Sequence, residues 1–272
     1  MQADKLQLQR YEIKYLVPES VALAARDFVR SYLALDDFGA SQPQFSYPVH
    51  SLYLDSDALT FYRQTLNGDR NRYKLRVRFY DDEINSPVFL EIKRRTNHTI
   101  SKQRCAVRRD ALCQLLSGQA LEAKSIASKN PDHFFALQKF IEMMMQNRAK
   151  PIAHVAYRRE AWISPMDNSV RVTMDRAVRF EAEPFPRLST GMRNPISVFG
   201  SEVVLELKFT NRFPVWFKEF VRVFQLTQGP AAKYAEGLTL YGEQRVRNEA
   251  CMFTTASRLV LPPRADLLKE AA

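Results

Sequence analysis

The stretch RYKLRVRFY, residues 72–80, alternates charged and uncharged side chains without interruption. Because successive side chains of a β-strand point to opposite faces, a strand here has one apolar face and one face with four cations. Such cations lie about 7 Å apart and repel one another unless an anion faces them. The stretch therefore predicts an anion-binding strand, and it predicts that Arg76→Ala leaves stability unchanged or slightly higher. Its cations are Arg72, Lys74, Arg76 and Arg78.

The same period of two recurs elsewhere and predicts about seven or eight antiparallel strands in total. Besides 72–80, the stretches with this pattern are residues 10–17, 48–55, 86–95, 152–163, 169–175 and 201–210. Apolar residues at helical spacing occur between and after them. They predict helices at residues 18–35, 56–66, 109–118, 131–148, 214–226 and 231–242.

The polar faces of the five clearest strands together carry ten cations and five anions. An antiparallel sheet with one solvated face also alternates in this way, and a single strand would favour that reading. A two-to-one excess over five strands favours a ligand-binding face, because opposed like charges are destabilising. If about eight strands close into a barrel, the charged set lines its interior. We therefore predict an α+β fold, a closed antiparallel β-barrel of about eight strands with flanking helices.

The composition points to a polyanionic partner. Among 272 residues, 40 Lys and Arg against 30 Asp and Glu give a formal net charge of +10, which favours phosphate compounds, nucleic acid or an acidic surface. The motifs GxxxxGK[ST] and GxGxxG are absent, and eight Gly leave little material for a backbone phosphate cradle. Phosphate would thus be held by Arg and Lys side chains.

No Gly/Ser tract or charge block divides the chain, so we predict a single domain over residues 1–242 and a peripheral segment over 243–272. No apolar stretch approaches the roughly 18 residues of a membrane span, and the start has no signal-peptide run, so a soluble cytoplasmic protein is expected. The odd cysteine count without a CxxC pair predicts reduced thiols at Cys105, Cys113 and Cys251.

Eight blocks follow one another along the chain: RYEIKYLV, SLYLDSDALTFYRQTLNGDRNRYKLRVRFY, VFLEIKRR, SKQRCAV, AYRREAW, RVTMD, VVLELKF and AAKYAEGL. In kind and in order they resemble the VTC-type polyphosphate polymerase domain, a branch of the triphosphate tunnel metalloenzymes (CYTH superfamily). The resemblance covers residues 10–242. It implies an antiparallel β-barrel tunnel in which basic residues bind ATP, through its triphosphate, and the growing polyphosphate chain.

Block by block, the resemblance also implies roles for single residues. Glu206 would hold a divalent cation, Mn²⁺ or Mg²⁺. Glu12 and Glu91 are further candidates for that metal, although pairing with nearby lysines on the same strand faces is the favoured reading. The residues with implied catalytic roles are Arg76, Arg78, Lys93, Arg159 and Arg171. The implied phosphate ligands are these five together with Lys14, Lys102, Lys208 and Lys233.

Two positions depart from the family's pattern. The wider superfamily begins with ExExK, and Arg10 stands at the first Glu position, which resembles the polymerase branch. Ala232 stands where the family often has Ser before the lysine of the late block, so product handling could differ. Because the chain shows no membrane segment of its own, a membrane partner subunit would have to supply one.

Three functions follow from these patterns. The leading hypothesis is a metal-dependent polyphosphate polymerase that moves the γ-phosphoryl group of ATP onto a polyphosphate chain and releases ADP. The second is hydrolysis of inorganic triphosphate or of a nucleoside triphosphate, with Glu12 or Glu91 activating water. The third is a polyanion-binding module without catalysis. No DNA partner is expected, because the basic strands lack the exposed aromatic residues on which single strands stack.

Overall fold

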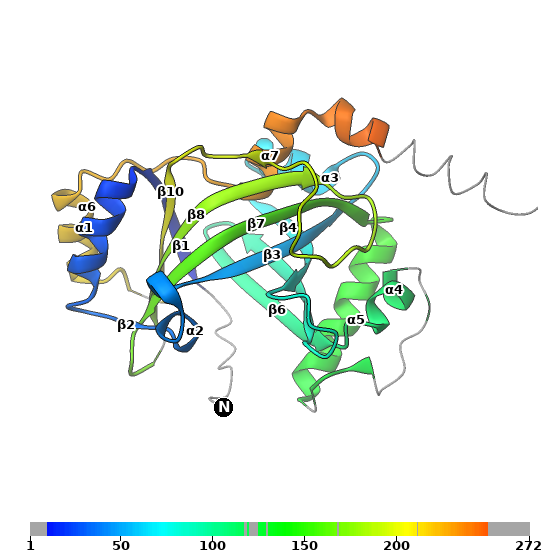
Figure 1. Ribbon diagram of the computed structural model, residues 1–272, viewed down its shortest axis with the longest axis horizontal. Helices are drawn as coiled ribbons and strands as arrows, with labels where there is room; N and C mark the ends of the chain where they lie inside the picture. Colours follow the sequence, from blue (N-terminus) through cyan, green and yellow to red (C-terminus); the bar gives the residue numbers. More distant parts are fainter. Residues whose placement is uncertain are drawn as a thin grey trace, which may run out of the picture.

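Figure 1 shows the computed structural model, which describes residues 10–116, 119, 125–128, 130–167, 169–210 and 212–249. Cys105 and Cys113 are free thiols, as predicted, whereas Cys251 lies outside the described residues. Of the predicted peripheral segment, residues 243–249 are helical and the rest lies outside the described part. The described residues contain no helix with the length and apolar character needed to span a membrane.

A ten-stranded sheet with antiparallel pairing forms the centre of the structure (Figure 1). Eight strands follow one path of hydrogen-bonded neighbours, in the order β1-β10-β8-β7-β3-β4-β5-β6, while β2 pairs with β7 and β9 with β8. All seven predicted strands are present. The strands are β1 (Tyr11–Val17), β2 (Ala34–Leu35), β3 (Ser46–Asp55), β4 (Asn71–Phe79), β5 (Val88–Thr96), β6 (Thr99–Val107), β7 (Lys150–Ile163), β8 (Val170–Ala182), β9 (Ile196–Ser197) and β10 (Val203–Phe209).

The sheet does not close into a barrel, so this part of the predicted fold is wrong. Its edge strands, β1 and β6, meet at one isolated bridge, in which the backbone N–H groups of Arg10 and Ile100 each donate to the other's carbonyl oxygen over 2.9 and 2.8 Å. Two residues further along the chain, in β1, the contact is between side chains: Glu12 accepts hydrogen bonds from Lys93 of β5. One backbone bridge therefore joins the two edges, and the Glu12–Lys93 ion pair links β1 to β5; among the described residues no continuous backbone ladder joins β1 to β6.

Helices pack on the sheet in three groups, two on the face opposite the strand cations and the third on the face that carries Tyr53 and Arg76 (Figure 1). One group packs on β1, β8 and β10, the second on β4, β5 and β6, and the third on β3, β7 and β8. The predicted helices are confirmed with shorter bounds. They are α1 (Glu19–Val29) and α6 (Val215–Val223) in the first group, α4 (Ala111–Leu116) and α5 (Pro131–Gln146) in the second, and α3 (Thr60–Leu66) and α7 (Lys233–Tyr241) in the third, with short turns α2 (Asp37–Ala40) and η1 (Pro43–Phe45) before β3.

The two faces of β4 separate as the alternation predicts. Leu75 and Val77 are fully buried and Ile92 of β5 is 3% exposed, and all three pack with Phe140 of α5 in one apolar cluster. The intervening charged residues therefore point to the opposite face, away from α5. A shift of one residue in any strand would exchange the two sets, so burial of the apolar set fixes where the cations lie.

Candidate anion-binding site

A cavity of about 1650 Å³ lies against the charged face of the sheet. Fourteen Arg and Lys residues line it, against seven Asp and Glu, so the cavity has a strong positive potential. It exceeds the roughly 300–1,000 Å³ of ordinary small-ligand sites, which leaves room for an elongated anion. All nine predicted phosphate ligands line it: Lys14, Arg76, Arg78, Lys93, Lys102, Arg159, Arg171, Lys208 and Lys233.

Glu91 is fully buried behind the cations of β4 and does not belong to the cavity lining. The β4–β5 register sets it opposite Arg76, whose Nε and Nη2 lie 2.8 and 2.7 Å from Glu91 Oε2. Arg78 Nη1 lies 3.8 Å from the same oxygen. Burial raises the pKa of Glu91, but the charges of Arg78 and Arg76 outweigh it and hold that pKa well below its usual range. Glu91 is thus an ionised counter-charge for the arginines, rather than the predicted partner of Lys93.

Two tyrosines orient these arginines, and the sequence analysis did not identify them. The hydroxyl of Tyr53 accepts a hydrogen bond from Arg76 Nη1 over 3.1 Å, and that of Tyr157 accepts from Arg78 Nη2 over 3.0 Å. Both tyrosines line the cavity. Alternation along β3 indicates which face of the strand Tyr53 occupies, but its place opposite Arg76 follows from the β3–β4 register.

Glu206 lies at the centre of a second charged cluster. Its carboxylate lies 2.6 Å from Lys208 Nζ, 3.0 Å from Lys233 Nζ and 3.2 Å from Lys14 Nζ. Burial raises the pKa of Glu206, yet these lysines hold it well below its usual range. The pKa of Lys208 is lowered to about 7, chiefly by burial and despite the charge of Glu206. Lys208 therefore changes its charge near neutral pH.

Asp175 joins the Glu206 cluster to Arg159 and was missed as a site residue. The Nε and Nη2 of Arg159 donate to the two carboxylate oxygens of Asp175, both over 2.7 Å, and Lys233 Nζ lies 2.7 Å from Asp175 Oδ2. The β7–β8 register pairs Arg159 directly with Asp175, whereas alternation along β8 indicates only which face of the strand Asp175 occupies. This fork fixes the guanidinium while other N–H groups remain for a ligand.

Two predicted ligands have acidic partners outside these clusters. Glu12 accepts hydrogen bonds from Lys93 Nζ over 2.9 and 3.1 Å, and it lies 3.3 Å from Lys14 Nζ, so its predicted pairing with Lys14 is confirmed. Arg171 Nη2 donates to Asp36 Oδ2 over 3.0 Å. Asp36 thus holds Arg171 at the wall of the cavity.

Lys74 differs from every cation described so far. It lines the cavity, but in the described part of the chain no carboxylate lies within ion-pair distance of it. Its cross-strand neighbour is Lys93, which in turn stands opposite Lys102. Burial, followed by the charges of Lys14, Lys93, Arg72 and Arg76, lowers the pKa of Lys74 well below its usual value. An anion placed before this row would supply the missing counter-charge.

Of the three predicted metal ligands, two are among the seven carboxylates that line the cavity. Glu206 and Glu12 line the cavity, and their mutual repulsion opposes ionisation of Glu12. Across the described residues, no group of three or more His, Cys, Asp or Glu side chains has metal-binding geometry. Two carboxylates nevertheless fit the way Mg²⁺ is held in nucleotide sites, by one or two carboxylates together with substrate phosphates and water.

Comparison with known proteins gives the cavity a family context. The VTC domain family matches residues 9–241. Vacuolar transporter chaperone complex subunit 4 of Trypanosoma cruzi (strain CL Brener) is 26% identical over 227 residues, which cover 72% of this chain and 28% of that protein. Its counterpart in Trypanosoma brucei brucei is 24% identical over 226 residues, with the same coverage. This chain therefore spans 28% of the length of these relatives.

A weaker likeness exists among solved structures. The PH1819 protein from Pyrococcus horikoshii OT3 aligns with 86% of this chain and 99% of its own length, at 12% identity and a TM-score of 0.44. A score at that level adds nothing to the family assignment.

Proposed function

The chain belongs to the VTC domain family, and from this membership and the charged cavity we propose that it is a polyphosphate polymerase. In the proposed reaction, a terminal oxygen of a phosphate chain attacks the γ-phosphorus of ATP. One P–O bond forms there, the bond between that phosphorus and the β,γ-bridging oxygen breaks, and ADP leaves with the bond's electrons. The observation that carries the proposal is the cavity wall of fourteen cations, which suits two polyanionic reactants at once.

Phosphoryl transfer requires in-line positioning and charge neutralisation more than covalent chemistry. Arg76 and Arg159 are suited to positioning phosphate, because buried carboxylates fix both guanidinium groups. Each guanidinium keeps further N–H donors that can bond to phosphate oxygens. Lys74, Lys93 and Lys102 form a row of cations across three strands, which suits successive phosphates of a chain. We assign these residues to positioning and charge stabilisation, together with Arg78, Arg171, Lys14, Lys208 and Lys233.

A divalent cation, Mn²⁺ or Mg²⁺, would be held by Glu206 with help from Glu12, and it would neutralise phosphate oxygens. Lys14, Lys208 and Lys233 now surround Glu206, and phosphate oxygens entering the cavity would draw these lysines away from the carboxylate. We leave Glu91 out of the proposed metal site because it does not line the cavity.

Hydrolysis of a triphosphate has less support, because it needs a carboxylate that accepts a proton from water. Burial raises the pKa of Glu12, but Lys93 and Lys14 lower it more, and the net result lies well below the usual range. A carboxylate held in this way is a poor general base near neutral pH. Neither Glu12 nor Glu91 is therefore poised to activate water.

The relatives' name raises the question of partners. They are subunits of a complex, and this chain spans only 28% of their length. We propose that a partner subunit at a membrane takes up the polymer, and that this chain makes the polymer.

The experiment incubates the protein with ATP and Mn²⁺, with and without a short polyphosphate primer, and measures ADP and acid-labile polymer. We expect one ADP to be released for each phosphate residue added to the polymer. Arg159→Gln should lower the rate at least about tenfold, because it removes a fixed donor to transferring phosphate. Arg158→Gln is the matched control, since the adjacent Arg158 donates to Ser46 O outside the cavity lining. Orthophosphate without polymer would indicate a hydrolase, and tight binding without turnover a binding module; either result contradicts the proposal.

A further inference from the structure

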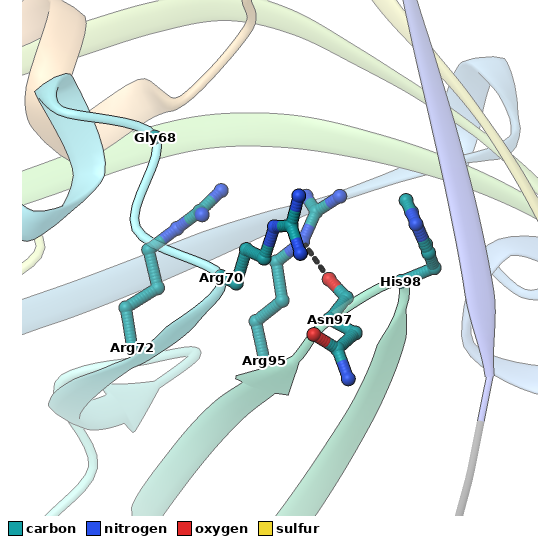
Figure 2. Close-up of a pocket in the computed structure, with 6 residues that line it drawn as sticks. All are labelled: Gly68, Arg70, Arg72, Arg95, Asn97 and His98. Atoms are coloured by element: carbon teal, nitrogen blue, oxygen red, sulfur yellow. Dashed lines mark hydrogen bonds between the residues drawn. The ribbon is translucent and has the colours of Figure 1, made fainter.

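A second, smaller cavity of about 280 Å³ lies where the β4 and β5 strands meet the turns beside them. Figure 2 shows its lining, in which three arginine side chains extend from neighbouring segments toward one space. The lining residues are Gly68, Arg70, Arg72, Arg95, Asn97 and His98, which we call the arginine pocket.

Two turns with left-handed backbone conformations build this pocket. Gly68, in the turn before β4, has φ +70°, and Asn97, between β5 and β6, has φ +53°. The Asn97 N–H donates to the Arg70 carbonyl oxygen over 2.9 Å and so ties the two turns together. Arg95 Nε donates to the Asn97 carbonyl oxygen over 2.9 Å, and Arg72 Nη1 donates to the carbonyl oxygen of Asp69. Backbone groups thus hold two of the three guanidinium groups in place.

The pocket concentrates positive charge without a counter-ion. None of its lining residues is acidic, and Arg70, Arg72 and Arg95 have no carboxylate within ion-pair distance in the described ranges. Arg72 stands directly opposite Arg95 in the β4–β5 ladder, and opposed like charges destabilise a sheet. Burial, followed by the charge of Arg95, lowers the pKa of Arg72, while Asp69 offsets only part of this. An anion in the pocket would relieve this repulsion.

The arginine pocket is adjacent to the large cavity. Arg72 and Arg95 line both spaces. The next cross-strand pair on the same face is Lys74 with Lys93, about 7 Å further along the strands. One unbroken line of cations therefore leads from the interior of the large cavity to the arginine pocket.

We propose that the arginine pocket is a second binding site for a linear oligophosphate, which holds the stretch of chain that extends beyond the large cavity. This inference deepens the proposed function and rests on it for the identity of the anion. Guanidinium forks match phosphate oxygens in charge and geometry. The lining contains no Tyr, Trp or Phe, so it offers more to phosphate oxygens than to a nucleotide base.

The test measures binding, so it does not depend on turnover. Tripolyphosphate and a linear polyphosphate long enough to reach both cavities are titrated by calorimetry at about 0.15 M salt. The variant Arg70→Gln should weaken long-chain binding at least about tenfold and change tripolyphosphate binding less than about twofold, because Arg70 does not line the large cavity. The control Lys218→Gln/Arg222→Gln removes two exposed charges from α6 and should leave both affinities within that twofold range.

Several results would overturn the inference. One is an equal loss for both anions, and another is no loss for the long chain. A similar loss of long-chain affinity in the α6 control would show that net charge causes the effect. An equal loss of affinity for a single-stranded RNA would show that the pocket binds polyanions in general. Long-chain binding no tighter than tripolyphosphate binding in the unaltered protein would also contradict it. A protein that passes these tests but forms no ADP from ATP would instead refute the polymerase proposal and leave the site standing.

Discussion

Arg76 and Lys74 are two residues apart on β4 and line the same cavity, yet their surroundings differ. Arg76 bonds to a fully buried carboxylate, Glu91, whereas Lys74 faces only other cations. The first arrangement is complete without a ligand and fixes the fold around it. The second lacks an anion. A cation with its own buried counter-charge therefore stabilises the fold even without a ligand, whereas a cation without one depends on the ligand for its counter-charge.

The largest expected effect is on the paired region. Glu91→Gln removes the counter-charge shared by Arg76 and Arg78 and leaves buried guanidinium groups uncompensated. We expect the free energy of unfolding to fall by about 3–5 kcal/mol, measured by urea denaturation.

Glu219→Gln on α6 provides the matched control, because Glu219 is exposed and its substitution should change stability by less than about 0.5 kcal/mol. If Glu91→Gln were no more destabilising than this control, the distinction between paired and unpaired cations would collapse.

The next effect is on the unpaired region. Lys74→Met should weaken tripolyphosphate binding roughly 10- to 100-fold, because it removes a charge-assisted contact with phosphate. Calorimetry measures this loss. Stability should stay the same or rise by about 1 kcal/mol, since the substitution relieves repulsion with Lys93 and Arg72.

Lys218→Met, which removes an exposed charge on α6, should leave tripolyphosphate affinity within about twofold. Marked destabilisation by Lys74→Met with unchanged affinity would assign Lys74 to the fold.

A smaller effect is the uptake of protons when the anion binds. The pKa of Lys74 is lowered in the empty cavity, and a bound phosphate raises it, so binding should take up protons at pH values between the two pKa values. Affinity then falls as pH rises through this interval. For stability the sign is opposite: the folded pKa lies below the unfolded value of 10.5, so the unfolded state binds more protons and stability rises with pH between them.

Titrations of tripolyphosphate in two buffers with different ionisation enthalpies report this proton uptake. Lys74→Met should reduce the uptake but not abolish it, because Lys208, with a pKa of about 7, contributes as well. Equal uptake in the variant and the unaltered protein would show that Lys74 stays charged in the empty cavity.

The smallest effect concerns an uncharged partner. Tyr157→Phe removes the hydroxyl that accepts from Arg78 Nη2 and should cost about 0.5–1.5 kcal/mol of stability. Thermal unfolding measures it, with Tyr11→Phe at the exposed start of β1 as control. A cost near that of Glu91→Gln would mean that the tyrosine, rather than the carboxylate, holds Arg78.

Alternation along the strands was enough to predict which side chains share a face. Leu75 and Val77 had to lie under helices because they are apolar, and this placed Arg76 and Arg78 on the other side of the sheet. The family resemblance predicted the cavity residues correctly for a related reason. Each matching block identifies a strand, and alternation along that strand determines which of its side chains face the cavity. These predictions depend only on local periodicity.

Alternation along one strand could not predict which residues of neighbouring strands pair with each other. The sequence suggested that Glu91 pairs with Lys93 along its own strand, whereas the β4–β5 register sets it opposite Arg76. For this reason the expectation that Arg76→Ala leaves stability unchanged no longer holds, and we now expect that variant to destabilise the protein. Closure of the sheet was also beyond local pattern, because it depends on how β1 approaches β6 across the whole structure.

A crystal structure with tripolyphosphate and Mn²⁺ tests the central claim most directly, because it shows which cations the anion meets. The account predicts phosphate oxygens within hydrogen-bonding distance of Lys74, Lys93 and Lys102, with the Arg76–Glu91 pair intact and the metal at Glu206. An anion bound outside the large cavity, or one that contacts Arg76 after breaking its pair with Glu91 while Lys74 stays without a partner, would contradict it.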